Sequence, residues 1–200
     1  MDRAHPSVLI HPAAAARPPL GQFTDPGAAF FIYLPALLEQ WVPELDGVEA
    51  LLEDGALGAA VGYGCGAAAM ALARAYPNSH FFGFDSDAAL VRRAQQRAFE
   101  QGVAERTTFE QAFPEAIPNH RYALVILLSG LAGSRDPMGV AWRALTTLDV
   151  AGSLLIVEPR TVGASLGRVS SPGSALAQAG FKRVRPIDET AFARVFEARR

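Results

Sequence analysis

Short apolar runs alternate along the chain with segments whose apolar residues recur at helical spacing. Four runs contain few polar residues, as strands buried on both faces of a sheet do: 57–62, 80–85, 122–130 and 153–159. A helical segment follows each of them, over 67–76, 87–102, 137–148 and 173–179. This alternation predicts a mostly parallel sheet with helices on both faces and right-handed crossovers.

Three further segments complete the predicted sheet. Residues 106–112 are expected to form a strand, and 182–189 and 191–200 are close enough in sequence to pair as antiparallel strands. The fold class is therefore α/β, with seven strands, most of them parallel, and a C-terminal antiparallel hairpin.

The helix predicted over 87–102 is amphipathic and ends at Gly102. The apolar positions near its helical spacing are Ala88, Val91, Ala94, Ala98 and Phe99. Three arginines, Arg92, Arg93 and Arg97, are expected on its solvated side.

The N-terminal quarter follows a different pattern. Residues 1–27 are rich in proline and small residues and are expected to form an arm. A helix bent or broken at Pro35 is predicted over 28–41, and a second helix over 43–53 that stops at Asp54-Gly55. We therefore divide the chain into an N-terminal arm with helices, 1–54, and an α/β domain, 55–200.

Composition narrows the class of protein. The 200 residues are 50% hydrophobic with a net charge of −2 and a pI near 6.1, which gives no global attraction to nucleic acid or to a membrane surface. One cysteine cannot form an internal disulfide, and no apolar run is long enough to cross a bilayer. The N-terminus lacks the pattern of a secretory signal. We expect a soluble cytoplasmic protein with a small-molecule partner.

A glycine-rich turn and an acid mark the candidate ligand site. The turn Gly62-Tyr63-Gly64-Cys65-Gly66 follows the first strand, and Asp85 closes the second. Glycines permit a tight turn and close approach of a ligand, and an acid at this position can accept both hydroxyls of a ribose. The pair indicates an adenosine-containing cofactor. In the less favoured alternative, the glycines form only a turn and Asp85 caps the next helix.

The pattern G-x-G-x-G at 62–66 resembles motif I of class I S-adenosylmethionine-dependent methyltransferases. The resemblance extends over 41–200 through WVPELDGV, AYPNSHFFGFD, GVAERTTFE and LLIVEP, which match a bacterial group often fused to a winged-helix segment. It implies a Rossmann-like fold and S-adenosylmethionine (SAM) as cofactor. The residues expected to bind it are Gly62, Tyr63, Gly64, Cys65, Gly66, Asp85, Ser86, Ala112, Phe113 and Ser129.

Several polar positions of that group are replaced here. In that group an acid usually lies two residues before the first glycine, and here this position is Ala60. Another acid of the group contacts adenine, and the aligned residue here is Phe113. The ionisable segment after the fourth strand reads Ser129 to Gly133, the lid over 160–171 is short, and no winged-helix segment is expected. Each lost charge-assisted bond would weaken cofactor binding by about 1.5–3 kcal/mol.

Three functions from different classes remain open. The first is a SAM-dependent methyltransferase acting on a small molecule. The second is a catalytically silent methyltransferase-like domain with a binding or assembly role. The third is a nicotinamide-dependent oxidoreductase, since Gly62, Gly64 and Ala67 also match the pattern G-x-G-x-x-A.

The sequence assigns no catalytic residue. Candidate bases near predicted strand ends are Glu158, Asp136 and His120, with Asp136 also a candidate helix cap. The four histidines are scattered without metal-ligand spacing.

The aromatic residues near the N-terminus are compatible with a homodimer. Four of them could form the wall of a pocket or a homodimer seam: Phe30, Phe31, Tyr33 and Trp41.

Overall fold

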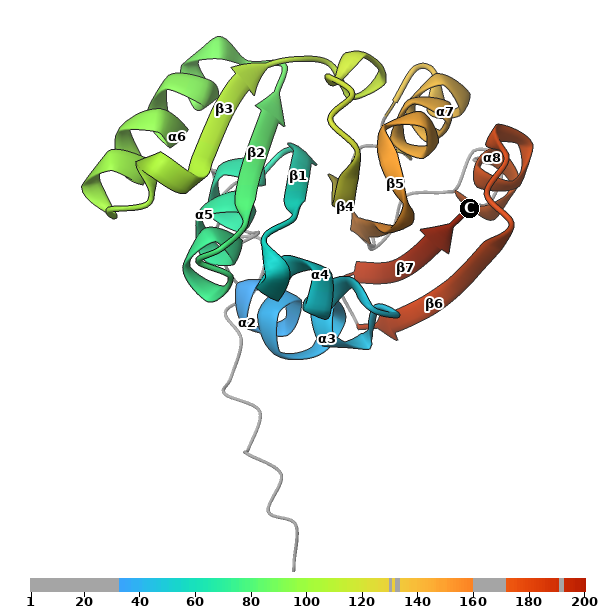
Figure 1. Ribbon diagram of the computed structural model, residues 1–200. Helices are drawn as coiled ribbons and strands as arrows, with labels where there is room; N and C mark the ends of the chain where they lie inside the picture. The colour runs from blue at the N-terminus through green and yellow to red at the C-terminus, as the bar shows by residue number, and fades with distance from the viewer. Residues whose placement is uncertain (1–32, 130, 132–133, 160–171, 191–192) are drawn as a thin grey trace, which may run out of the picture.

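The computed structural model describes residues 33–129, 131, 134–159, 172–190 and 193–200, and it is built around one sheet (Figure 1). The strands are β1 Leu57–Gly62, β2 His80–Asp85, β3 Thr107–Gln111, β4 Tyr122–Leu128, β5 Leu148–Pro159, β6 Arg183–Glu189 and β7 Ala193–Arg199. Their order is β3-β2-β1-β4-β5-β7-β6. Strands β1 to β5 pair in parallel, and β7 is antiparallel to both β5 and β6. The predicted seven-stranded, mostly parallel sheet with a C-terminal antiparallel hairpin is confirmed.

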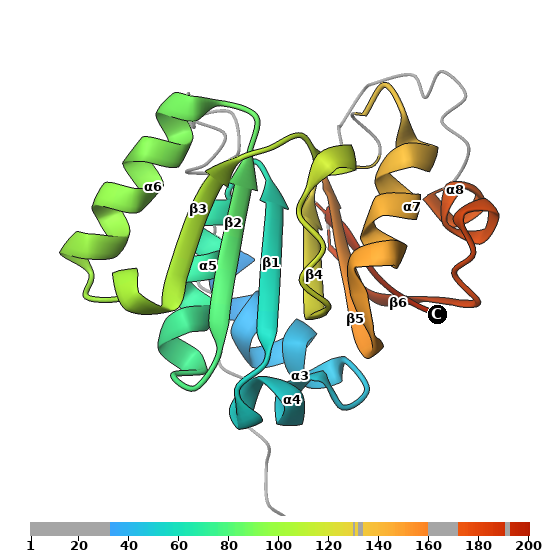
Figure 2. The ribbon, with the colours of Figure 1, turned by 45° about the horizontal axis from the view of Figure 1, so that its top comes forward.

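Helices pack on the two faces of the sheet (Figure 2). The larger ones are α4 Val48–Asp54, α5 Cys65–Ala75, α6 Ala88–Glu100, α7 Pro137–Thr147 and α8 Pro172–Ala179. The short ones are α2 Leu34–Ala36, the π-helix η3 Leu37–Trp41, α3 Val42–Glu44, and the 3₁₀ turns η4 Ala104–Arg106 and η5 Pro114–Ala116. One core cluster joins η3, α4, α5 and α6 to one face, and a second joins α7 and α8 to the other.

The predicted N-terminal helices differ from those observed. Pro35 lies at the start of the described helical segment, which runs from α2 into α3, and residues 28–32 of the helix predicted over 28–41 lie outside the described residues. The helix predicted over 43–53 is wrong, because Leu45 is extended and Gly47 is left-handed, which separates α3 from α4. The stop at Gly55 is confirmed by its left-handed backbone, with φ of 104°.

Helix α6 packs through a narrower stripe than predicted. Its buried residues are Val91, Ala94 and Ala98, whereas Phe99 is 79% exposed. The next residue after Ala98 points about 100° further round the helix, away from the sheet. Asp87 begins the helix, since its carboxylate accepts the amide N–H of Ala89 at 2.7 Å.

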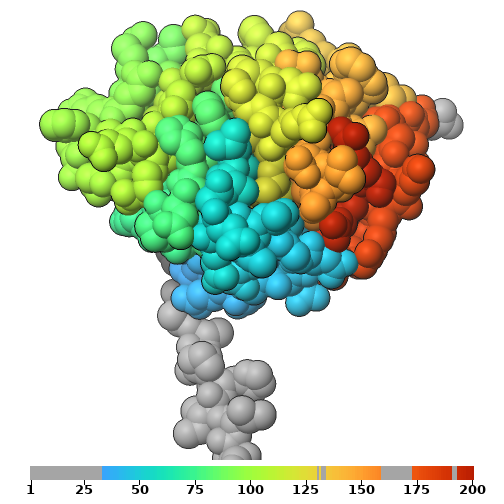
Figure 3. Space-filling view, in the orientation of Figure 1, coloured from blue at the N-terminus to red at the C-terminus, as the bar shows by residue number. Residues whose placement is uncertain are grey.

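Arg185 links the C-terminal hairpin to the N-terminal helices and also pairs with a buried carboxylate. Glu197 on β7 is 1% exposed and accepts the Ser153 hydroxyl at 2.7 Å and the Arg185 Nε–H at 2.6 Å. Arg185 on β6 also reaches Glu44 at 3.4 Å. In Figure 3 the blue and cyan N-terminal elements lie directly against the red hairpin. Trp41 is buried beneath it and donates to Asp188 at 3.0 Å, so it belongs to the core and not to a dimer seam.

This arrangement predicts unequal effects for Glu197 and Glu44, two of the acids that contact Arg185. We expect Glu197→Ala to lower the free energy of unfolding by about 3 kcal/mol, because it leaves the Ser153 hydroxyl and a guanidinium without their buried acceptor. The matched control Glu44→Ala removes a mostly exposed carboxylate and should cost less than about 1 kcal/mol. Urea unfolding measures both values. Equal losses would contradict the assignment.

Candidate functional site

The turn between β1 and α5 is shaped by glycines at three positions. Gly62 and Gly64 have left-handed φ angles of 90° and 99°. A Cβ on Gly62 would lie 2.7 Å from the carbonyl oxygen of Leu128 on the neighbouring strand β4. A Cβ on Gly66 would lie 3.0 Å from that of Ala94, so this glycine lets α5 approach α6. The chain can therefore enter α5 while the carboxyl ends of β1 and β4 stay in contact.

Asp85 lies beside this turn at the carboxyl end of β2. The side chain is buried, and its Oδ1 accepts the amide N–H of Asp87 at 2.8 Å. Burial raises the pKa of Asp85 above its ordinary value, and the nearby Asp87 charge adds to the rise, while backbone N–H groups oppose it. The carboxylate therefore becomes protonated at a higher pH than a freely solvated aspartate does.

A cleft of about 660 Å³ opens along the carboxyl ends of β1, β2, β3 and β4. This volume falls within the range of small-molecule sites. Phe113 is 60% exposed and forms part of the wall, leaving the space open. The predicted site residues that line the cleft are Gly62, Tyr63, Asp85, Ser86, Ala112, Phe113 and Ser129.

Ser129 combines an exposed side chain with an unusual backbone. Its φ of 56° is left-handed, and its amide N–H donates to the carbonyl of Val157 at 3.0 Å. A non-glycine residue in this region carries strain, which tends to occur at functional sites. The bend directs the chain away from β4 at the edge of the cleft.

Six cleft residues were not among the expected cofactor ligands. They are Pro114, Glu115, Leu128, Ser134, Arg135 and Asp136. All but Leu128 lie in the connections after β3 and β4, and the carboxyl ends of parallel strands meet at the same edge. The meeting of strand ends at one edge could have pointed to these connections from the sequence, although it does not say which of their residues face the cleft.

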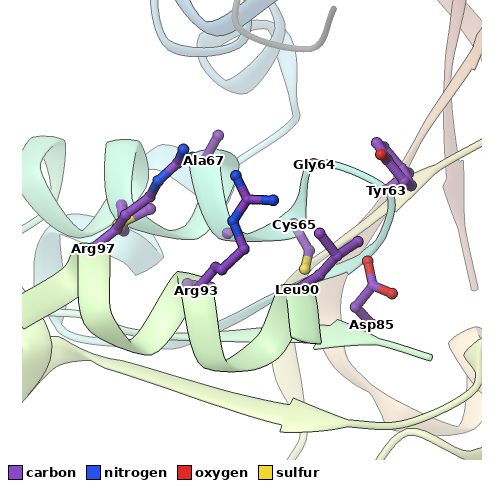
Figure 4. Close-up of a pocket in the computed structure, with 11 residues that line it drawn as sticks. Tyr63, Gly64, Cys65, Ala67, Asp85, Leu90, Arg93 and Arg97 are labelled. Atoms are coloured by element: carbon purple, nitrogen blue, oxygen red, sulfur yellow. The ribbon is translucent and has the colours of Figure 1, made fainter. Parts of the chain in front are cut away.

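The other predicted residues, Gly64, Cys65 and Gly66, line a separate hollow of about 70 Å³ between α5 and α6. Figure 4 shows this hollow with Tyr63 and Asp85 at one end. Burial, and then the charge of Asp85, raise the pKa of the Cys65 thiol to about 12. The thiol is therefore protonated at neutral pH and is a poor nucleophile.

The three candidate bases occupy different surroundings. Glu158 on β5 is buried and its Oε1 accepts the amide N–H of Leu131 at 3.2 Å. Asp136 lines the cleft and caps α7 by accepting the Gly139 N–H at 2.8 Å, which confirms the predicted capping role. His120 is excluded as a base for this cleft, because it precedes β4 and stacks on Phe82 at the amino end of the sheet.

Two further features follow from the described residues. Ala60, which replaces the usual acid, is 1% exposed within the core and does not line the cleft. Among the described residues, no group of three or more histidine, cysteine or acidic side chains could hold a metal ion, and no helix is long and apolar enough to span a membrane.

Residues 59–144 match the family model of a methyltransferase domain. A search of curated protein sequences found no significant match. Among solved structures, a SAM-dependent methyltransferase from Aquifex aeolicus aligns over 88% of this chain and 98% of its own, with a TM-score of 0.64 and 18% identity.

Two larger neighbours show the same fold. Human N-acetylserotonin methyltransferase, solved in complex with SAM, aligns over 87% of this chain with a TM-score of 0.64 and 18% identity. The mitomycin 7-O-methyltransferase MmcR aligns over 86% with a TM-score of 0.66 and 17% identity. The chain spans only 53% and 54% of their lengths. These neighbours and the strand order give the described part of the chain the Rossmann-like fold of SAM-dependent methyltransferases, and the family match covers 59–144 of its 200 residues.

The close contact at Gly62 predicts that a side chain at this position destabilises the fold. We expect Gly62→Ala to destabilise the fold by roughly 3 kcal/mol, since the new Cβ meets a backbone oxygen in addition to a strained φ. Gly102→Ala is the control, because Gly102 also has a positive φ but open space around it, and it should cost about 1 kcal/mol. Thermal or urea unfolding of both variants gives the comparison. A Gly62 variant no worse than the control would contradict it.

Proposed function

We propose that the chain is a SAM-dependent methyltransferase that acts on a small molecule in the cytoplasm. The observation that carries this proposal is the placement of the buried Asp85 carboxylate and the Gly62 turn on the wall of one open cleft of about 660 Å³. The methyltransferase-domain match and the complex of the human neighbour with SAM support the choice of cofactor.

The residues present fit an adenosine. Asp85 supplies a carboxylate that can accept both ribose hydroxyls, with its position fixed by the bond from the Asp87 amide. Phe113 offers an exposed aromatic face at the same cleft, on which an adenine ring can pack in place of the usual acid. The glycine turn admits the ligand close to the backbone. We infer that these contacts hold the cofactor.

The bound cofactor would supply an electrophilic methyl carbon. The chain's own contribution is to align the acceptor with that carbon and to exclude water, and this asks little of acid–base groups. Asp136 already accepts a backbone N–H, and the buried Glu158 accepts the amide N–H of Leu131. We therefore expect an acceptor that is nucleophilic without deprotonation by the protein, or that is already ionised at neutral pH.

A specific observation favours a second candidate, a catalytically silent methyltransferase-like domain with a binding or assembly role. The two positions at which related methyltransferases carry acids hold Ala60, buried in the core, and Phe113. The enzyme must bind SAM and transfer its methyl group, whereas the second candidate keeps the same fold without turnover. Transfer of a labelled methyl group from SAM to a panel of phenols, amines and thiols distinguishes them: turnover supports the enzyme, and binding without turnover supports the second candidate.

Calorimetric titration with SAM, S-adenosylhomocysteine and NADH tests the cofactor. We expect binding of the first two and no binding of NADH. Asp85→Asn should weaken binding by about 10-fold or more, because a charge-assisted bond is worth about 1.5–3 kcal/mol. Asp87→Asn is the matched control, since it removes the neighbouring charge and retains an oxygen to cap α6. Unchanged affinity in Asp85→Asn would reject the assigned ribose site.

The raised pKa of Asp85 predicts a dependence on pH. The ribose hydroxyls donate to the ionised carboxylate, so affinity should be constant well above its pKa and fall as the pH drops through it. Glu115 and Asp136 also line the cleft, so the pH profile of Asp85→Asn serves as the reference. The part of the decline that Asp85 causes should be absent from that variant. Identical profiles would contradict the role of this carboxylate.

A further inference from the structure

The hollow between α5 and α6 has a positive wall that the proposed function does not use. Arg93 and Arg97 line it from α6, while Gly64 to Ala67 line it from α5. Figure 4 shows the two guanidinium groups reaching from α6 toward α5. Both arginines are exposed, which confirms the predicted solvated side of α6, and both also line the rim of this hollow.

Neither arginine has a partner in the part of the chain that the structure describes. No ion pair or side-chain hydrogen bond of Arg93 or Arg97 occurs there, whereas Arg183, Arg185 and Arg199 all pair with Asp46. The two side chains are separated by one helical turn, and like charges at this spacing repel each other. Two converging, uncompensated guanidinium groups are the arrangement that binds oxyanions.

We propose that this hollow binds an oxyanion of phosphate size, held by Arg93 and Arg97. Its volume of about 70 Å³ admits a group of a few atoms and not a whole nucleotide. Asp85 and Cys65 are the other titratable groups that line it. The thiol is uncharged at neutral pH, and Asp85 lies at the end of the hollow beside Tyr63, away from the arginines (Figure 4).

The oxyanion has two sources that share this chemistry. Free inorganic phosphate would occupy the hollow alone. A nucleoside monophosphate could instead bring its phosphate to the arginines and its sugar toward Asp85, because Asp85 and Tyr63 line both the hollow and the cleft. The site does not depend on methyl transfer, so it can be tested whether or not the chain is an enzyme.

The test is thermal unfolding and calorimetric titration with inorganic phosphate, with adenosine 5′-monophosphate and with chloride at constant ionic strength. We expect phosphate, but not chloride, to raise the melting temperature. Arg93→Ala and Arg97→Ala should each weaken phosphate binding by about 10-fold or more. Arg92→Ala is the matched control, since Arg92 is exposed on the same helix but does not line the hollow.

The two probes separate the sources. If S-adenosylhomocysteine leaves phosphate binding unchanged, a free anion is supported. If adenosine 5′-monophosphate binds more tightly than phosphate and competes with S-adenosylhomocysteine, the nucleotide is supported. Alanine is a good helix former, so the variants should fold with an unliganded melting temperature at least equal to that of the native protein. No stabilisation beyond chloride, or equal loss in Arg92→Ala, would overturn the proposal.

Discussion

The close contact between the β1–α5 turn and β4 is the constraint on which the site depends. Gly62 lies so near the Leu128 carbonyl that no side chain fits between them, and its left-handed backbone turns the chain into α5. The same turn sets the distance between the two central strands at their carboxyl ends. The cleft exists because the chain diverges from this point in two directions, into α5 and into the connection after β4.

Burial and charge are balanced differently on the two sides of that turn. On the cleft side, burial raises the pKa of the Asp85 carboxylate, and the Asp87 amide holds this carboxylate in place. On the helix side, Arg93 and Arg97 carry uncompensated positive charge at a hollow that the same glycine turn also lines. An acidic side chain and two basic side chains thus lie on the two sides of one backbone segment.

The strands followed from the sequence because continuous apolar runs leave few alternatives for a chain buried on both faces. The break between α3 and α4 was missed, although Asp46-Gly47 directly after the extended Leu45 is a turn signal of the same kind as Asp54-Gly55. Glycine turn and acid were recognisable because strand direction brings them to one edge. Glu115 and Arg135 were missed because they lie in connections whose course depends on packing, and His120 was misplaced because loops at either end of a strand look alike in sequence.

Residue-resolved amide shifts during titration with S-adenosylhomocysteine test whether the cofactor binds at the carboxyl edge of the sheet. We expect the largest changes there, at Tyr63, Gly64, Ser86 and Ala112, while the amide of His80 at the opposite edge stays unchanged. Saturating ligand without shifts at these positions, or with shifts of equal size at the amino edge, would contradict a site at the carboxyl edge.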